Sequence, residues 1–186
     1  MPAYQPMPEV PRPGPAPRDI AELLSMIRAA ERPVMVCGGG SVLSGAFDAV
    51  REVAEMFGIP ILATPAGRGI LPEDHDLFCG SVGLYRTEFP KSVYQNADLL
   101  ITLGSRMEEF QSAAFSYFPD GAKFVQIDID PFELGRNWLP DLAIQSDAAL
   151  AMQLLLEAGE RISVTPDQER LDEDLASMPD GRRTMV

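Results

Sequence analysis

The chain has 186 residues, of which 46% are hydrophobic and 23% charged, and this composition is typical of a soluble globular domain with a sizeable core. The net charge of −13 argues against binding to nucleic acid or to an anionic membrane, because so acidic a chain repels phosphate groups. No apolar run approaches the roughly 20 residues that a membrane span needs, and the chain does not begin with a signal peptide, so we expect a cytoplasmic protein.

Proline and polar residues mark both ends of the sequence. Residues 1–17 contain seven prolines and show no helical or strand period, so we interpret them as an extended linker. Residues 161–186 are polar and contain no obvious core element, and we interpret them as a second linker. The folded domain is therefore expected over residues 18–160, within a larger polypeptide.

Helical and strand signals alternate between these linkers. A first helix is predicted from Asp19, as its cap, with Glu22 in the capping-box position. Its apolar stripe consists of Ile20, Leu23, Leu24 and Ile27. Further helices are predicted over 44–57 and 146–159, the last capped by Ser146 or Asp147. Buried strands are predicted at Val34–Cys37, Ile59–Ala63, Leu99–Leu103, Lys123–Ile129 and Ala143–Gln145.

Continuous apolar strands separated by helices indicate a parallel sheet covered on both faces. We therefore predict an α/β fold: a doubly wound, mostly parallel sheet of about five or six strands with helices on both faces, as in Rossmann-like domains. In such sheets ligands bind outside the carboxyl ends of the strands.

Few residues suggest catalysis or metal binding. Cys37 and Cys79 lie among apolar residues, and we interpret both as buried, reduced thiols. The only histidine, His75, lies in an acidic loop and has no obvious partner for a metal site or a catalytic pair. We predict no catalytic residue and no metal ligand in this chain.

Three consecutive glycines, Gly38–Gly40, follow the first predicted strand. They match the start of a dinucleotide-binding fingerprint, but Leu43 stands where its third glycine would be, and a P-loop lysine is absent. A nucleotide cradle and a plain turn both remain open. We favour the cradle, because a turn needs one glycine for its backbone, whereas three remove every side chain from the approach of a ligand.

Polar residues follow two further strands at the same expected edge. Arg106 follows the third predicted strand, and Asp128 and Asp130 follow the fourth. An arginine suits a pyrophosphate, and carboxylates suit ribose hydroxyls or an adenine amine. Alternatively, Arg106 pairs with Glu108, Glu109 or Asp128 and only ties loops together.

Taken in order, five segments resemble the central domain of thiamine-diphosphate-dependent enzymes of the acetolactate synthase type. They read RPVMVCGGG, FGIPILATPAGRGILPEDHDLFCGSVG, NADLLITLGSRMEE, KFVQIDIDPFELG and QSDAAL. The resemblance implies a three-domain enzyme acting on a 2-oxo acid, a lyase or a transferase that forms homo-oligomers. Its flanking domains would bind thiamine diphosphate and Mg²⁺, so this chain alone would be inactive.

In several members of that family the central domain holds FAD or an ADP moiety. The resemblance places such a nucleotide against Gly38, Gly39, Gly40, Thr64, Gly83, Arg106, Asp128 and Asp130. Two departures stand out: Arg86 replaces a glycine, which favours an ADP-like ligand over FAD, and Phe110 replaces an arginine, which argues against acetolactate synthesis itself. The alternatives are a stand-alone nucleotide- or flavin-binding module and a small Rossmann enzyme.

Overall fold

The computed structural model describes residues 11–160, so most of the first predicted linker and all of the second lie outside the described residues. Six parallel strands form one sheet in the order β3-β2-β1-β4-β5-β6. The strands are β1 (Pro33–Cys37), β2 (Ile61–Ala63), β3 (Phe78–Ser81), β4 (Leu99–Leu103), β5 (Lys123–Asp128) and β6 (Leu142–Gln145). The first three strands follow one another from β1 toward one edge of the sheet, and β4, β5 and β6 follow one another from β1 toward the other edge. This change in the order of the strands between β1 and β4 confirms the predicted doubly wound fold.

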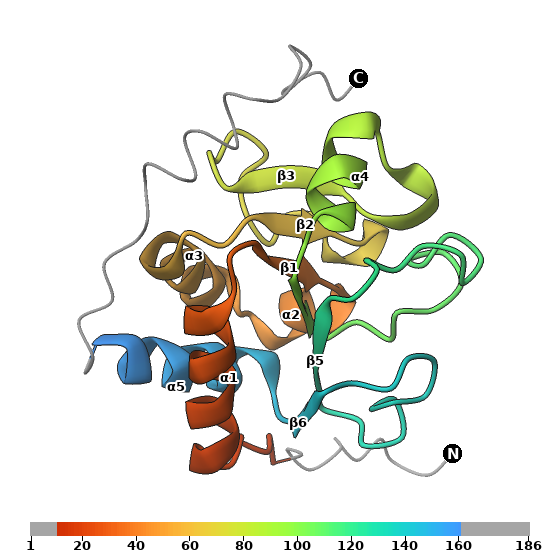
Figure 1. The fold of residues 1–186 in the computed structure, drawn as a ribbon. Helices are drawn as coiled ribbons and strands as arrows, with labels where there is room; N and C mark the ends of the chain where they lie inside the picture. The colour runs from red at the N-terminus through yellow and green to blue at the C-terminus, as the bar shows by residue number, and fades with distance from the viewer. Residues whose placement is uncertain (1–10, 161–186) are drawn as a thin grey trace, which may run out of the picture.

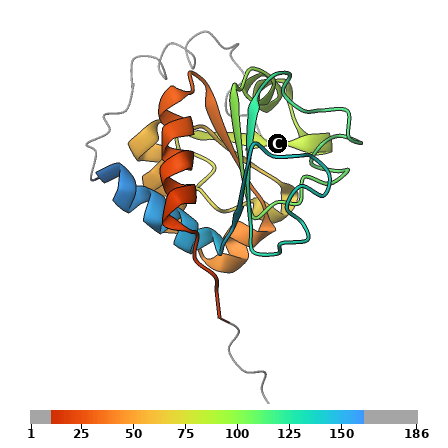
Figure 2. The same ribbon diagram turned by 60° about the horizontal axis from the view of Figure 1, so that its bottom comes forward.

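Helices cover both faces of this sheet (Figures 1 and 2). They are α1 (Pro17–Ala29), α2 (Gly39–Ser44), α3 (Phe47–Phe57), α4 (Glu88–Gln95) and α5 (Ala148–Glu160), with short 3₁₀ turns η1 (Pro65–Gly67) and η2 (Gly83–Tyr85). Helices α1, α3 and α5 pack on one face, whereas α4 and the loops that follow β3 and β4 cover the other. The strands are therefore buried on both sides, which explains their continuous apolar runs.

The alternation of side chains along each strand divides the core into two clusters. Met35, Ile101 and Val125 point to the face of α1, α3 and α5. Val36 and Leu100 point to the opposite face, toward α4. All five are fully buried, so each strand contributes to both cores and the sheet forms the centre of the molecule.

Several predicted elements differ from the structure. The helix predicted over 44–57 begins later, as α3 at Phe47, because Gly45 adopts φ 74° and ends a separate helix, α2, that was not predicted. Helix α1 begins at Pro17, so Asp19 lies inside the first turn and the predicted Asp19 cap is wrong. Proline fits the first helical position because it needs no hydrogen-bond acceptor there. The predicted cap of the last helix is confirmed, since Asp147 Oδ1 accepts from the amides of Ala149 (3.0 Å) and Leu150 (3.2 Å).

Within residues 11–160, no helix is long and apolar enough to cross a membrane. Both cysteines are free and buried, as predicted.

The turns that follow β1 and β4 touch each other through glycine backbone. A Cβ on Gly38 would overlap the Gly104 carbonyl group, and one on Gly40 would lie 2.8 Å from Gly104 Cα. Gly104 itself has φ 59°, whereas Gly38 and Gly40 have ordinary negative φ values. The expectation that geometry alone would need one glycine is therefore wrong: the close approach excludes side chains at both positions.

We expect Gly40→Ala to lower the free energy of unfolding by about 1–3 kcal/mol, because its methyl group would force two backbone segments apart. The matched control is Gly14→Ala, since a Cβ on Gly14 meets no atom within 4 Å, and this variant should stay within about 0.5 kcal/mol of the parent. Urea unfolding followed by circular dichroism measures both. Equal stability of the two variants would show that the glycine contact is not tight.

Candidate functional site

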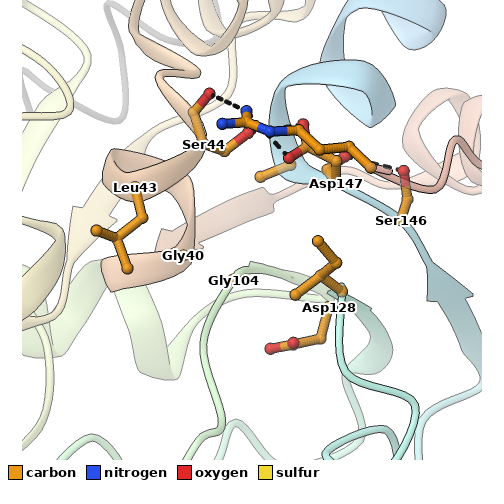
Figure 3. A pocket seen from close by; sticks show the side chains of 10 residues that line it. Gly40, Leu43, Ser44, Gly104, Asp128, Ser146 and Asp147 are labelled. Carbon is orange, nitrogen blue, oxygen red and sulfur yellow. Dashed lines mark hydrogen bonds and ion pairs between the residues drawn. The ribbon is translucent and has the colours of Figure 1, made fainter. Parts of the chain in front are cut away.

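A pocket of about 200 Å³ lies at the carboxyl edge of the sheet, beside the reversal point between β1 and β4. Ten residues line it: Arg12, Gly40, Leu43, Ser44, Gly104, Asp128, Ile129, Ser146, Asp147 and Ala148. Figure 3 shows Leu43 and Ser146 on opposite sides of the pocket, with Asp128 facing it from the end of β5. Ligands of doubly wound domains bind at this position, so the pocket is the candidate functional site.

The structure brings only part of the predicted site together. Gly40 and Asp128 line the pocket, and Gly38 packs against its Gly104 wall. Thr64 does not line it; its buried hydroxyl caps η1 by accepting from Gly67 N at 3.2 Å. Gly83 is also outside the pocket.

Gly83 has a structural role as the first residue of the η2 turn. Its φ is 86°, and a Cβ there would overlap the Phe110 carbonyl group. The Arg86 guanidinium donates to Gly83 O at 2.6 Å and lies 4.3 Å from the centre of the Tyr117 ring. Arg86 therefore folds back and ties the η2 turn to the loop that contains Phe110, whose side chain is half exposed.

The amides of the glycine turn are already hydrogen-bonded inside the protein. Gly38 N donates to Leu103 O at 2.9 Å and Gly40 N donates to Gly104 O at 3.0 Å. Ser41 N donates to Gly38 O at 3.1 Å. A phosphate cradle uses such N–H groups as its donors, so these three amides fix the turn and are not directed at a ligand.

Asp128 supplies the buried carboxylate of the pocket. Its side chain accepts a hydrogen bond from Asp130 N at 3.0 Å and is almost fully buried. Burial raises the pKa of Asp128 above its ordinary value, and the nearby charges of Glu133 and Asp130 act in the same direction. Asp130 itself is exposed, and its Oδ1 accepts from Phe132 N at 2.9 Å, so it mainly shapes the turn after β5.

The structure pairs Arg106 with Glu133, a residue that the sequence analysis did not single out. Arg106 Nε lies 3.8 Å from Glu133 Oε1, and the Arg106 side chain is 65% exposed. Arg136 Nη1 donates to the same oxygen at 2.8 Å. Within the described residues, Glu133 Oε2 is buried and has no hydrogen-bond partner. The alternative considered from the sequence, a pairing of Arg106 with Glu108, Glu109 or Asp128, is wrong as to the partner.

Asp147 connects three parts of the chain at the other side of the pocket. Its carboxylate accepts from Ser44 Oγ at 2.7 Å and lies 3.4 Å from Arg12 Nη1. Its backbone amide donates to Pro13 O at 2.8 Å. Arg12 and Pro13, which lie in the predicted first linker and outside any helix or strand, are therefore held against the domain.

The fold and the pocket define a doubly wound α/β domain with a cavity at its topological switch point. The chain belongs to the family of thiamine pyrophosphate enzyme central domains, whose model matches residues 20–155. The predicted family is therefore confirmed.

Similar proteins support the same assignment. A probable acetolactate synthase large subunit of Methanocaldococcus jannaschii is 37% identical over 142 residues, which are 76% of this chain and 24% of that protein. Glyoxylate carboligase of Escherichia coli O157:H7 is 32% identical over 184 residues, 98% of this chain and 31% of that protein. The chain thus spans about a quarter to a third of the length of these relatives.

The crystal structure of benzoylformate decarboxylase from Polynucleobacter necessarius superposes with a TM-score of 0.67 at 24% identity, covering 84% of this chain and 30% of that one. At this identity the match supports the fold alone.

We expect Asp128→Asn to stabilise the domain more at pH 7 than at pH 3. The folded pKa of Asp128 is raised, so ionisation of the wild-type carboxylate costs stability as pH rises from the unfolded pKa through the folded pKa. Below both pKa values the carboxyl group is neutral in both states, and the penalty disappears. Asparagine keeps an acceptor for Asp130 N but carries no charge.

Urea unfolding of both proteins between pH 3 and pH 7 measures this difference. Asp48→Asn is the control, because Asp48 is 85% exposed on α3. A stability difference for Asp128→Asn that does not grow with pH would contradict the buried, destabilised carboxylate.

Proposed function

We propose that this chain is the central domain of a longer thiamine-diphosphate-dependent enzyme that processes a 2-oxo acid. Its relatives are about three to four times as long as the matched region, which supports flanking domains in the complete protein. The described residues contain no group of three or more His, Cys, Asp or Glu side chains that could hold a metal ion. We propose that the flanking domains bind thiamine diphosphate and Mg²⁺, and that the complete enzyme works as a cytoplasmic homo-oligomer.

Within that enzyme, the domain's own role is to hold an ADP- or FAD-type nucleotide, not to perform the catalytic step. The observation that carries this proposal is the pocket between Gly40, Gly104 and Asp128 at the switch point of the sheet. Its walls combine glycine backbone with a buried carboxylate that would accept from ribose hydroxyls or an amine. Leu43 and Ile129, which are 84% and 48% exposed, offer apolar contact for a base.

Glu133 is a second buried carboxylate near the end of β5. Its charge acts on Asp128, but its side chain does not line the pocket. The pocket's own carboxylate, Asp128, is the group that would accept a hydrogen bond from a hydroxyl or amine of a bound nucleotide, so the lining residues fit the proposed group.

The size of the pocket and the position of Arg86 favour an ADP-like ligand over FAD. A volume of about 200 Å³ accommodates one base or sugar at a time. The side chains of Arg86 and Tyr117 occupy the space next to Gly83. In the family that the sequence resembles, a glycine at the position of Arg86 would leave this space open to a flavin.

We expect ADP or coenzyme A to bind the wild-type chain more tightly than FAD in isothermal titration. Asp128→Asn should weaken that binding by roughly 1.5–3 kcal/mol, the scale of a hydrogen bond to a charged group. Arg106→Ala should weaken it as well if Arg106 meets the phosphates. Asp48→Asn, which removes one exposed carboxylate from α3, serves as the control and should leave the affinity unchanged. The nucleotide role is wrong if none of the three ligands binds the wild type at millimolar concentration.

We also expect the 186-residue chain alone to show no saturable binding of thiamine diphosphate in the presence of Mg²⁺. The reason is that the proposed cofactor-binding domains lie outside this sequence. Calorimetry with cofactor and metal together tests this, and a clear binding isotherm would assign part of the cofactor site to this chain.

A further inference from the structure

Two residues that precede α1, Arg12 and Pro13, lie against the pocket and are called the strap here. We propose that the strap is a releasable latch that completes the pocket, so that the position of the segment before the domain and the occupancy of the pocket are coupled. The strap is one wall of the pocket, because Arg12 is among the residues that line it.

The strap contacts three residues of the domain, at the end of α2 and at the start of α5. Arg12 Nη1 donates to Ser44 O at 2.9 Å and lies 3.4 Å from Asp147 Oδ2. Pro13 O accepts from Asp147 N at 2.8 Å and from Ser146 Oγ at 3.3 Å. The strap thus bridges the end of α2 and the beginning of α5, which are more than 100 residues apart in sequence.

The environment of Asp147 makes this latch releasable. The carboxylate is only 5% exposed, so losing every partner would leave a buried charge. Ser44 Oγ and the amides of Ala149 and Leu150 still bind it when Arg12 leaves. Opening therefore costs the strap's own hydrogen bonds and leaves the α5 cap intact, which gives two well-defined states separated by a modest free energy.

Proline limits the conformations of the undocked strap. Pro11, Pro13 and Pro15 alternate with Arg12 and Gly14, and each proline ring fixes one backbone torsion. Docking therefore orders little additional backbone, and a displacement upstream is transmitted to Arg12 instead of being absorbed by a flexible chain.

Coupling follows from linkage. A molecule that contacts Arg12 from within the pocket stabilises the docked state of the strap. By linkage, docking of the strap raises the affinity of that molecule by the same factor by which the molecule shifts the docking equilibrium. The coupling to a nucleotide rests on the proposed function, whereas the latch itself does not, so the two are measured separately.

The latch is tested without any ligand by amide hydrogen exchange. The Asp147 amide, which donates to Pro13 O, should exchange roughly three- to tenfold faster in Arg12→Ala than in the wild type, the range expected when a half-exposed charged contact is lost. The Ala151 amide donates to Asp147 O at 3.0 Å in the next turn of α5 and should be unchanged. Arg18→Ala is the matched control, since Arg18 is 89% exposed and, among residues 11–160, pairs only with its neighbour Asp19.

A second reporter uses cysteine chemistry. Ser146 is 1% exposed beneath Pro13 O, so a Ser146→Cys thiol should react with a maleimide only when the strap opens. Cys37 and Cys79 do not interfere, because burial raises the pKa of each thiol to about 12. Labelling of Ser146→Cys should accelerate with Arg12→Ala and remain within about twofold with Arg18→Ala.

Equal exchange and labelling rates in Arg12→Ala and Arg18→Ala would overturn the latch. Acceleration at Ala151 as well as at Asp147 would also overturn it, because that pattern is unfolding of α5. With the latch established, saturating ADP should slow exchange of the Asp147 amide, which donates to Pro13 O, and should leave the Ala151 amide unchanged; ADP that binds by calorimetry without slowing exchange at Asp147 overturns the coupling. If ADP does not bind at all, the proposed nucleotide function and the coupling fail together, and the exchange rates still decide the latch.

Discussion

The arrangement of the strand edge depends on the backbone contact between the turn after β1 and the turn after β4. Gly38 and Gly40 press against Gly104 on one side. On the other side Gly67 packs against the carbonyl group of Cys37, and a Cβ on Gly39 would lie 3.1 Å from Ala66 Cβ. The turn is thus enclosed between two other turns, and a methyl group on most of these glycines would separate backbone from backbone. Such contacts yield less easily than contacts with a flexible side chain.

This contact also determines where the polar groups of the pocket lie. With its first residues held over Gly104, the six-residue helix α2 carries Ser44 to the start of α5. Ser44 then accepts from Ala149 N at 2.9 Å and donates to Asp147 at 2.7 Å. The cap of α5, the end of α2 and the segment before α1 are consequently one hydrogen-bonded unit. A change at the glycine contact would therefore be felt at Asp147 through α2.

The fold could be predicted from the sequence where a strand is a long, continuous apolar run. Strands β1, β4 and β5 follow continuous buried runs, and their predicted positions agree with the structure to within a residue or two. Strand β3 was missed because it has four residues, includes Gly80 at φ 107°, and pairs with β2 through an irregular register. Helix α4 was missed because it is short and contains Pro90, which is tolerated there only because it lies in the first turn.

The candidate site was less accessible to sequence reasoning, because its decisive contacts join distant residues. Nothing local indicates that Arg12 meets Asp147, or that Glu133 rather than Asp128 pairs with Arg106. From the sequence, the glycine run favours a cradle that a ligand can approach, whereas in the structure it allows close packing against Gly104, 64 residues away from Gly40. A Gly-rich turn after a first strand is thus compatible with tight packing as well as with ligand binding, and only the direction of its N–H groups separates the two.

The charges around the pocket limit how a nucleotide can lie in it. Asp128 and Asp147 both face this region as buried acids, and the one cation among the lining residues, Arg12, is already paired with Asp147. A phosphate placed inside would gain little from that paired cation and would meet the field of two carboxylates. A neutral base or sugar that donates hydrogen bonds suffers no such penalty. Arg106 and Arg136 lie beside Glu133 and are 65% and 61% exposed, so phosphates are better accommodated there, outside the pocket. The same field explains why an arginine suits the strap: its positive charge offsets the buried carboxylate of Asp147.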